Sequence, residues 1–139
     1  MFNPPDDDTI LSDGLTGPRG RIIFAVRLDD SKPASEGLRK LKRRDYRKYA
    51  RFKALFIQYV QAGVLPPSKL DSYVGTPLRK FKHSESYPFR IPCFKDSKNA
   101  TVLTHIFEKK GSKQVQRNID KALVIRQEHF ESLSVTRAH

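Results

Sequence analysis

A chain of 139 residues is long enough for one compact domain with a single core and too short for two domains of ordinary size. Hydrophobic residues make up 37% of it, which excludes wholesale disorder, and no apolar run approaches the roughly 20 residues that a membrane span needs. The formal net charge of +12 predicts attraction to a polyanion: nucleic acid, an acidic membrane surface or an acidic protein.

The first 20 residues contain the segments PPDDD, SDG and TGPRG and have little periodic apolar content. We predict that residues 1–20 form a flexible acidic N-terminal tail and that residues 21–139 form a single domain. The acidic, proline-bearing start does not have the pattern of a signal peptide. The single cysteine, Cys93, lies in an apolar stretch and has no internal disulfide partner, so we expect a cytoplasmic protein.

The segment RIIFAVRLD, residues 21–29, is β-branched and aromatic, which predicts a strand. A short helix is expected from Pro33, because proline suits the first turn of a helix. After a tight corner, a long helix is predicted with Asp45 as its N-cap and Gly63 at its end. Its apolar residues recur at steps of three and four.

Three strands and a helix are predicted to follow. The strands span residues 78–83, 89–94 and 101–108, with Pro92 at an edge or a bulge, and the last helix begins at Ser112. The order β-α-α-β-β-β-α indicates an α+β fold. Its small, mainly antiparallel sheet carries an N-terminal helical pair and a C-terminal helix.

Cationic side chains recur on one face of this predicted sheet. Alternation along a strand places Lys80 and Lys82 on one face and sets Arg90 opposite the apolar residues of its strand, while the third strand ends in Lys109 and Lys110. If the strands are neighbours, the first three and one of the paired lysines converge, and no acidic residue has an evident place among them. Crowded cations fit an oligoanion and lower one another's pKa, which favours a lysine as proton acceptor. A solvated basic face is the alternative.

A second basic feature is the segment RKLKRRDYRKYARFK, residues 39–53, with nine Lys or Arg and one Asp. Its apolar residues keep helical spacing, so the cations coat the outer face. This surface fits contact with a nucleic-acid backbone, and a solvated helix face is the other interpretation. The candidate RNA-binding residues on it are Arg43, Arg44, Arg47 and Lys48.

Patterns typical of metal and cofactor sites are missing from the sequence. One cysteine and four scattered histidines do not have the spacing of a zinc site. There is no Gly-rich phosphate loop, no GxSxG and no HExxH motif. We therefore expect neither a metal nor a cofactor, and any chemistry must come chiefly from Lys and Arg.

The series LRKFKHSESYPFRIPCF, then VLTHIFEKKG, then SKQVQRNIDKALVIRQEHF resembles the RelE/ParE superfamily of toxin–antitoxin toxins. The phage-derived HigB-like branch is the most similar. The resemblance covers about residues 21–133 and depends on the order and spacing of these segments, because no single motif is diagnostic. It implies a RelE-like fold.

The resemblance also implies a function: a metal-independent endoribonuclease that cuts messenger RNA on the ribosome and so inhibits translation. Carried over by position, the catalytic residues would be Lys80, Lys82, Arg90 and Lys110, with Lys109 supporting them in RNA binding. The implied partners are the ribosome, mRNA and a cognate antitoxin, commonly of the helix-turn-helix type. Two alternatives remain, because fold does not fix function: a ParE-like inhibitor of DNA gyrase, or a non-catalytic basic nucleic-acid-binding protein.

Overall fold

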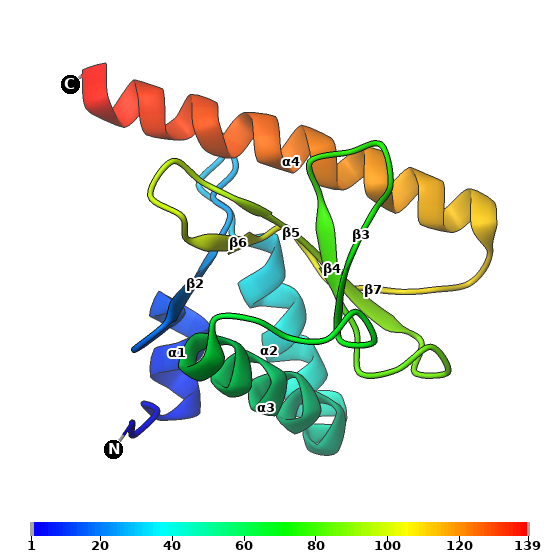
Figure 1. The fold of residues 1–139 in the computed structure, drawn as a ribbon. Helices are drawn as coiled ribbons and strands as arrows, with labels where there is room; N and C mark the ends of the chain where they lie inside the picture. Colours follow the sequence, from blue (N-terminus) through cyan, green and yellow to red (C-terminus); the bar gives the residue numbers. More distant parts are fainter. Residues whose placement is uncertain (1, 139) are drawn as a thin grey trace.

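The computed structural model describes the backbone of residues 2–138 and the side chains of residues 2–134. Helices and strands are mixed along the chain (Figure 1). In order, they are α1 (Asp7–Asp13), β1 (Leu15–Gly17), β2 (Gly20–Phe24), α2 (Pro33–Arg44), α3 (Tyr46–Ala62), β3 (Leu70–Ser72), β4 (Arg79–Phe81), β5 (Phe89–Lys95), β6 (Thr101–Leu103), β7 (Phe107–Glu108) and α4 (Ser112–Ala138).

The strands form one sheet in the order β1-β2-β6-β5-β4-β3, and β7 pairs with β5 beside this path. Of the six strand pairs in the described chain, five are antiparallel; β2 and β6 run parallel, with Ile22 opposite Thr101. The predicted α+β class and the mainly antiparallel sheet are therefore confirmed. The predicted element order is incomplete, because α1, β1, β3 and β7 are additional elements.

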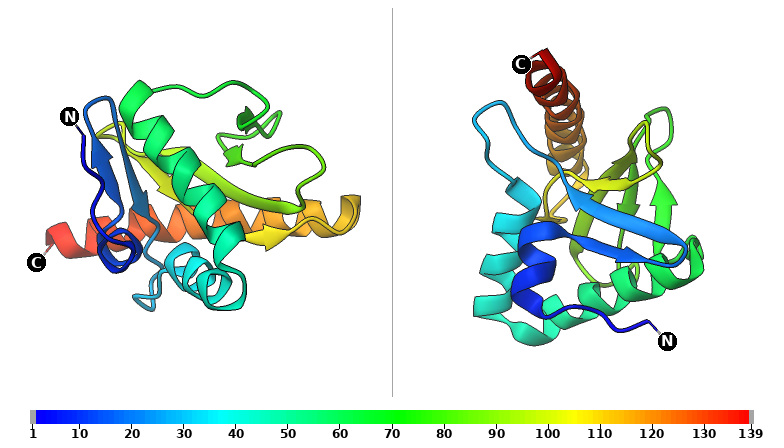
Figure 2. Two further views of the ribbon diagram at one scale, coloured as in Figure 1. Left: turned by 90° about the horizontal axis from the view of Figure 1, so that it is seen from below. Right: turned by 90° about the vertical axis from the view of Figure 1, so that its left-hand side faces the viewer.

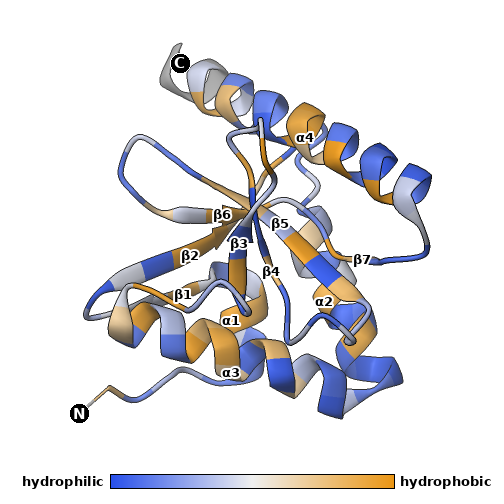
Figure 3. Ribbon diagram, turned by 45° about the vertical axis from the view of Figure 1, so that its right-hand side comes forward, coloured by the Kyte–Doolittle hydropathy of each residue, from blue (hydrophilic) through white to orange (hydrophobic). Residues whose placement is uncertain are grey.

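The sheet separates two helical layers (Figure 2). One core cluster joins α1, α2 and α3 to one sheet face, and a second joins α4 to the other face. In α3 the apolar residues Tyr49, Phe52, Phe56 and Tyr59 recur at helical spacing and are buried, while polar residues face outward. Figure 3 shows this mixture of hydrophobic and hydrophilic residues along α3 and α4, as expected for helices that each cover one face of the sheet.

The ends of α3 lie where the sequence predicts them. The Asp45 side chain accepts a hydrogen bond from the backbone N–H of Lys48 at 3.4 Å and so serves as the N-cap. Gly63 ends the helix in the left-handed conformation with φ 81°, which glycine adopts without the steric cost of a Cβ. Both local signals are confirmed.

The expectation of a flexible tail over residues 1–20 is wrong. Asp6 caps α1 by accepting a hydrogen bond from the N–H of Thr9 at 2.8 Å. Ile10 and Leu11 then enter the core with 3% and 1% of their surface exposed, and Leu15 continues it from β1. Because these few apolar residues bury almost completely, tertiary packing outweighs the polar composition that suggested a tail.

The single strand predicted over residues 101–108 is two strands. β6 pairs with the end of β5, and β7 pairs with its beginning. The break falls opposite Pro92, which has no N–H to donate. The Pro92 carbonyl instead accepts hydrogen bonds from the Thr104 backbone N–H at 2.9 Å and from its hydroxyl at 3.1 Å, and the chain then leaves the ladder.

Candidate active site

Lys80 stands at the centre of β4, between Asp71 on β3 and Pro92 on β5. Its side chain is half-buried, and its Nζ lies 4.6 Å from the centre of the Tyr73 ring. Within residues 2–134 no hydrogen bond or ion pair engages this ammonium group. Burial lowers the pKa of Lys80, and the neighbouring positive charges of Lys82 and Arg90 lower it further against the opposing effect of Asp71.

Tyr73 provides the second unusual group of this site. Its hydroxyl is buried and has no hydrogen-bond partner within the described residues. Burial raises the pKa of Tyr73 to about 12, so the phenol stays protonated and can donate. A buried polar group without a partner is costly, so this hydroxyl is an unusual feature beside Lys80.

Lys82 follows β4 directly and is almost fully buried. Its Nζ is paired with the Glu85 carboxylate and lies 3.9 Å from an Asp71 oxygen. The expectation that no acid lies among these cations is therefore wrong. The loop after β4 folds back and brings Glu85 to Lys82, and Asp71 approaches Lys82 from β3. The hydrogen bond from Lys82 and its charge lower the pKa of Glu85.

Arg90, on β5, is 2% exposed, and its guanidinium faces the inside of the same loop. It donates hydrogen bonds to the carbonyl oxygens of Tyr87, of Phe89 at 3.0 Å and of Glu85 at 3.1 Å. These contacts order the loop that carries Glu85. Arg90 thus positions the loop that covers Lys82.

Lys109 and Lys110 are exposed in the short connection between β7 and α4. The Lys109 N–H donates to the Pro88 carbonyl at 2.7 Å, which extends the β5–β7 ladder by one residue, and the Lys110 N–H donates to the Gln114 side chain at 3.1 Å. In the described part of the chain, neither lysine bonds to Lys80 or its neighbours. The structure brings together three of the four predicted catalytic residues and leaves Lys110 outside.

The other four predicted RNA-binding residues surround the corner between α2 and α3. Arg43 and Arg44 belong to the last turn of α2, where positive charge complements the helix dipole, and Arg47 to the first turn of α3. These three are exposed and form no ion pair within residues 2–134. Lys48 is half-buried, 3.8 Å from Asp45 and 5.3 Å over the Phe89 ring.

Part of the basic segment is neutralised by the N-terminal residues. The Asp7 carboxylate lies 2.7 Å from Lys53 and 3.8 Å from Lys42, and it accepts hydrogen bonds from the hydroxyls of Tyr46 at 3.1 Å and Tyr49 at 3.2 Å. The segment is therefore divided between cations that hold α1 and cations that face outward.

Two residues of the site, Asp71 and Tyr73, were missed because no strand was predicted from the sequence between Gly63 and residue 78. The signal that identifies them is alternation: Asp71 and Tyr73 stand two apart, and Asp71 is opposite Lys80 in the register of β3 with β4. Glu85 carries no such signal, because its position depends on how the loop closes.

The described residues contain neither a metal-binding cluster nor a helix able to span a membrane. Within them, no three His, Cys, Asp or Glu side chains are grouped so that they could hold a metal ion. None of the helices in this part of the chain combines the length and hydrophobicity that crossing a bilayer requires.

Comparison with known proteins places this chain in no family: no family model, no curated protein and no solved structure matches it.

Proposed function

We propose that this protein is the toxin of a type II toxin–antitoxin system and acts as a metal-independent endoribonuclease on translated mRNA. The observation that carries the proposal is Lys80: a half-buried ammonium group with a lowered pKa and no carboxylate bonded to it among the described residues. A lowered pKa increases the neutral fraction near pH 7, and only a neutral amine accepts a proton. The RelE-like resemblance supplies the substrate class.

The reaction needs only the groups of this site and the RNA. Lys80 accepts the proton of a ribose 2′-hydroxyl, whose oxygen forms a bond to the adjacent phosphorus. The bond from phosphorus to the 5′-oxygen breaks, and that oxygen takes a proton from the solvent or from the Lys80 ammonium. The products are a 2′,3′-cyclic phosphate and a 5′-hydroxyl end.

The surroundings of Lys80 favour the charged transition state. The face of the Tyr73 ring, 4.6 Å from the Lys80 Nζ, stabilises the positive charge that Lys80 acquires when it accepts the proton. The charge of Lys82 adds a favourable potential that its carboxylate partners reduce. Arg90 keeps the loop in place through its bonds to backbone carbonyls.

Association with the ribosome is assigned in this proposal to the exposed corner of α2 and α3. Exposed arginines that make no internal ion pair are available to contact RNA phosphates. The activity would reside in the cytoplasm, where translated messages are found. A cognate antitoxin, which the same resemblance implies to be a helix-turn-helix protein, would mask the cationic surface until the toxin is released.

The direct test is the cleavage rate of an mRNA on translating ribosomes. Lys80→Gln removes the proton acceptor while keeping a side chain of similar length, and we expect cleavage to fall by about 10²–10⁴-fold. Lys32→Gln is the matched control, because Lys32 is exposed at the start of α2, and it should cut as the parent does. Circular dichroism verifies that both variants are folded. Equal cleavage by Lys80→Gln and the parent would exclude the proposed catalytic role.

A second experiment separates this function from its alternatives. Brief induction in cells, followed by mapping of RNA ends and of DNA breaks, should give new RNA ends inside reading frames and intact DNA. DNA breaks without RNA ends would favour a gyrase inhibitor. Neither signal would favour a non-catalytic nucleic-acid-binding protein.

A further inference from the structure

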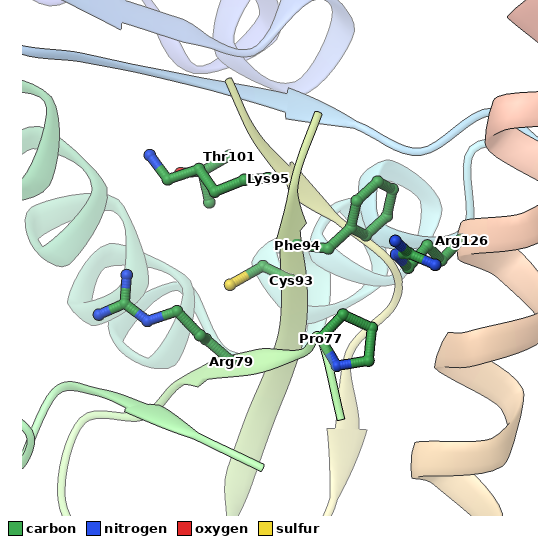
Figure 4. Close-up of a pocket in the computed structure, with 7 residues that line it drawn as sticks. All are labelled: Pro77, Arg79, Cys93, Phe94, Lys95, Thr101 and Arg126. Atoms are coloured by element: carbon green, nitrogen blue, oxygen red, sulfur yellow. The ribbon is translucent and has the colours of Figure 1, made fainter. Parts of the chain in front are cut away.

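A separate pocket of about 220 Å³ lies at the edge of β5. The pairing of β4 with β5 ends at Arg79 opposite Cys93, so the last residues of β5 have no strand beside them on that side. Figure 4 shows the residues that line the pocket. They are Pro77, Arg79, Cys93, Phe94, Lys95, Thr101 and Arg126.

Three of these residues are cations, and none is an acid. In Figure 4, Arg79 and Lys95 extend on the same side of β5 as Cys93, while Arg126 approaches from α4 on the opposite side of the strand. Arg79 makes no ion pair within the described residues. The Lys95 Nζ donates to the Tyr59 hydroxyl at 2.8 Å and to the Asn99 carbonyl at 3.3 Å, both of them neutral groups. This differs from the Lys80 site, where Asp71 and Glu85 offset the positive charge.

Arg126 is held in place by aromatic rings. The centre of its guanidinium lies 5.7 Å from the Phe94 ring and 5.1 Å from the Phe130 ring. Its Nε is buried and has no hydrogen-bond partner in residues 2–134. A planar guanidinium fixed by stacking and left with unused donors loses little entropy when it binds an oxyanion.

Cys93 does not make this pocket a thiol site. The side chain is buried, and burial raises the pKa of its thiol to about 12, so the nucleophilic thiolate is scarce at neutral pH. The pocket is also smaller than the roughly 300–1,000 Å³ of sites for drug-sized ligands. Its size and its charge together suit a small anionic group.

We propose that this pocket binds a phosphate group, contributed either by an RNA backbone or by a free nucleotide. Two arginines from different elements and Lys95 would surround the phosphate oxygens, and the open edge of β5 admits the attached nucleoside. This binding site is additional to the Lys80 site and does not depend on the proposed cleavage.

The test is a titration of ¹⁵N-labelled protein followed by amide chemical shifts. The probes are UpU, which has one phosphodiester and no terminal phosphate, and 5′-AMP, with potassium chloride at matched ionic strength as the reference. We expect saturable shifts at Cys93 and Thr101 with at least one nucleotide probe and none with chloride. Arg79→Gln should weaken this binding by about tenfold, and Arg79→Lys by less, because a charge remains.

Arg117→Gln is the matched control, since Arg117 is exposed on α4 and does not line the pocket; it should bind as the parent does. Saturation by UpU identifies a backbone phosphate as a ligand, and saturation by 5′-AMP alone identifies a free nucleotide. Shifts that do not saturate with either probe, that chloride reproduces, or that persist unchanged in Arg79→Gln would overturn the proposal. Because the readout is binding, failure of RNA cleavage leaves this result unaffected.

Discussion

Replacing Leu11 by alanine tests whether the N-terminal residues belong to the folded core. Leu11 is 1% exposed and packs in the cluster that includes Ile10, Leu15 and residues of α2 and α3. Truncating a leucine buried to this degree costs about 2–5 kcal/mol, because transfer free energy is lost and a cavity remains. Domains have a total stability of only about 5–15 kcal/mol, so the effect is a large fraction of it.

Urea denaturation followed by circular dichroism measures this cost. With a slope of about 1–3 kcal/mol per molar urea, the midpoint should fall by about 1 M or more. Leu28→Ala is the matched control, because Leu28 is 54% exposed and its truncation should change the unfolding free energy by less than about 0.5 kcal/mol. If Leu11→Ala and Leu28→Ala unfold at the same urea concentration, α1 does not contribute to the core and the packing argument fails.

Two further predictions concern charge. Asp7→Asn should lower the unfolding free energy by about 1 kcal/mol at neutral pH. Burial alone would raise the pKa of Asp7, but hydrogen bonds from Lys53 and Tyr46 outweigh it, so the folded-state pKa lies below the ordinary 3.8. The stabilisation is therefore present above pH 3.8 and lost on further acidification; a difference between parent and variant that persists unchanged at the lowest pH would contradict this. Replacing the four predicted RNA-binding residues at the α2–α3 corner together by glutamine should weaken co-sedimentation with ribosomes and flatten its salt dependence. Unchanged co-sedimentation at every salt concentration would show a merely solvated surface. These residues are Arg43, Arg44, Arg47 and Lys48.

The parts of the fold that the sequence predicts are those with a strong local cause. Asp45 and Gly63 mark the ends of α3 because capping and the left-handed conformation depend on the residue itself. Strand alternation likewise brings Lys80 near Arg90. Ile10 and Leu11 were missed because only three-dimensional packing reveals what two apolar residues in a polar segment contact.

The candidate site was predicted only in part, for a related reason. Residues 82–88 form an irregular loop, and its closure brings Glu85 to Lys82 and sets backbone carbonyls around Arg90. The fold of an irregular loop leaves no periodic pattern in the sequence, so the position of Glu85 could not be predicted. The charge count of the cluster was therefore wrong, although Lys80, Lys82 and Arg90 do lie near one another.

The parallel pairing of β2 with β6 has a consequence for how the chain folds. Ile22 meets Thr101 only after α2, α3 and the strands β3, β4 and β5 have been synthesised. Until then β2 and β5 both lack β6, the strand that lies between them in the sheet. Closing so long a loop carries an entropic cost before its contacts form, which makes this step slow relative to the helical hairpin of α2 and α3. On the ribosome, α2 and α3 of the emerging chain would therefore form some time before β6 joins the two parts of the sheet.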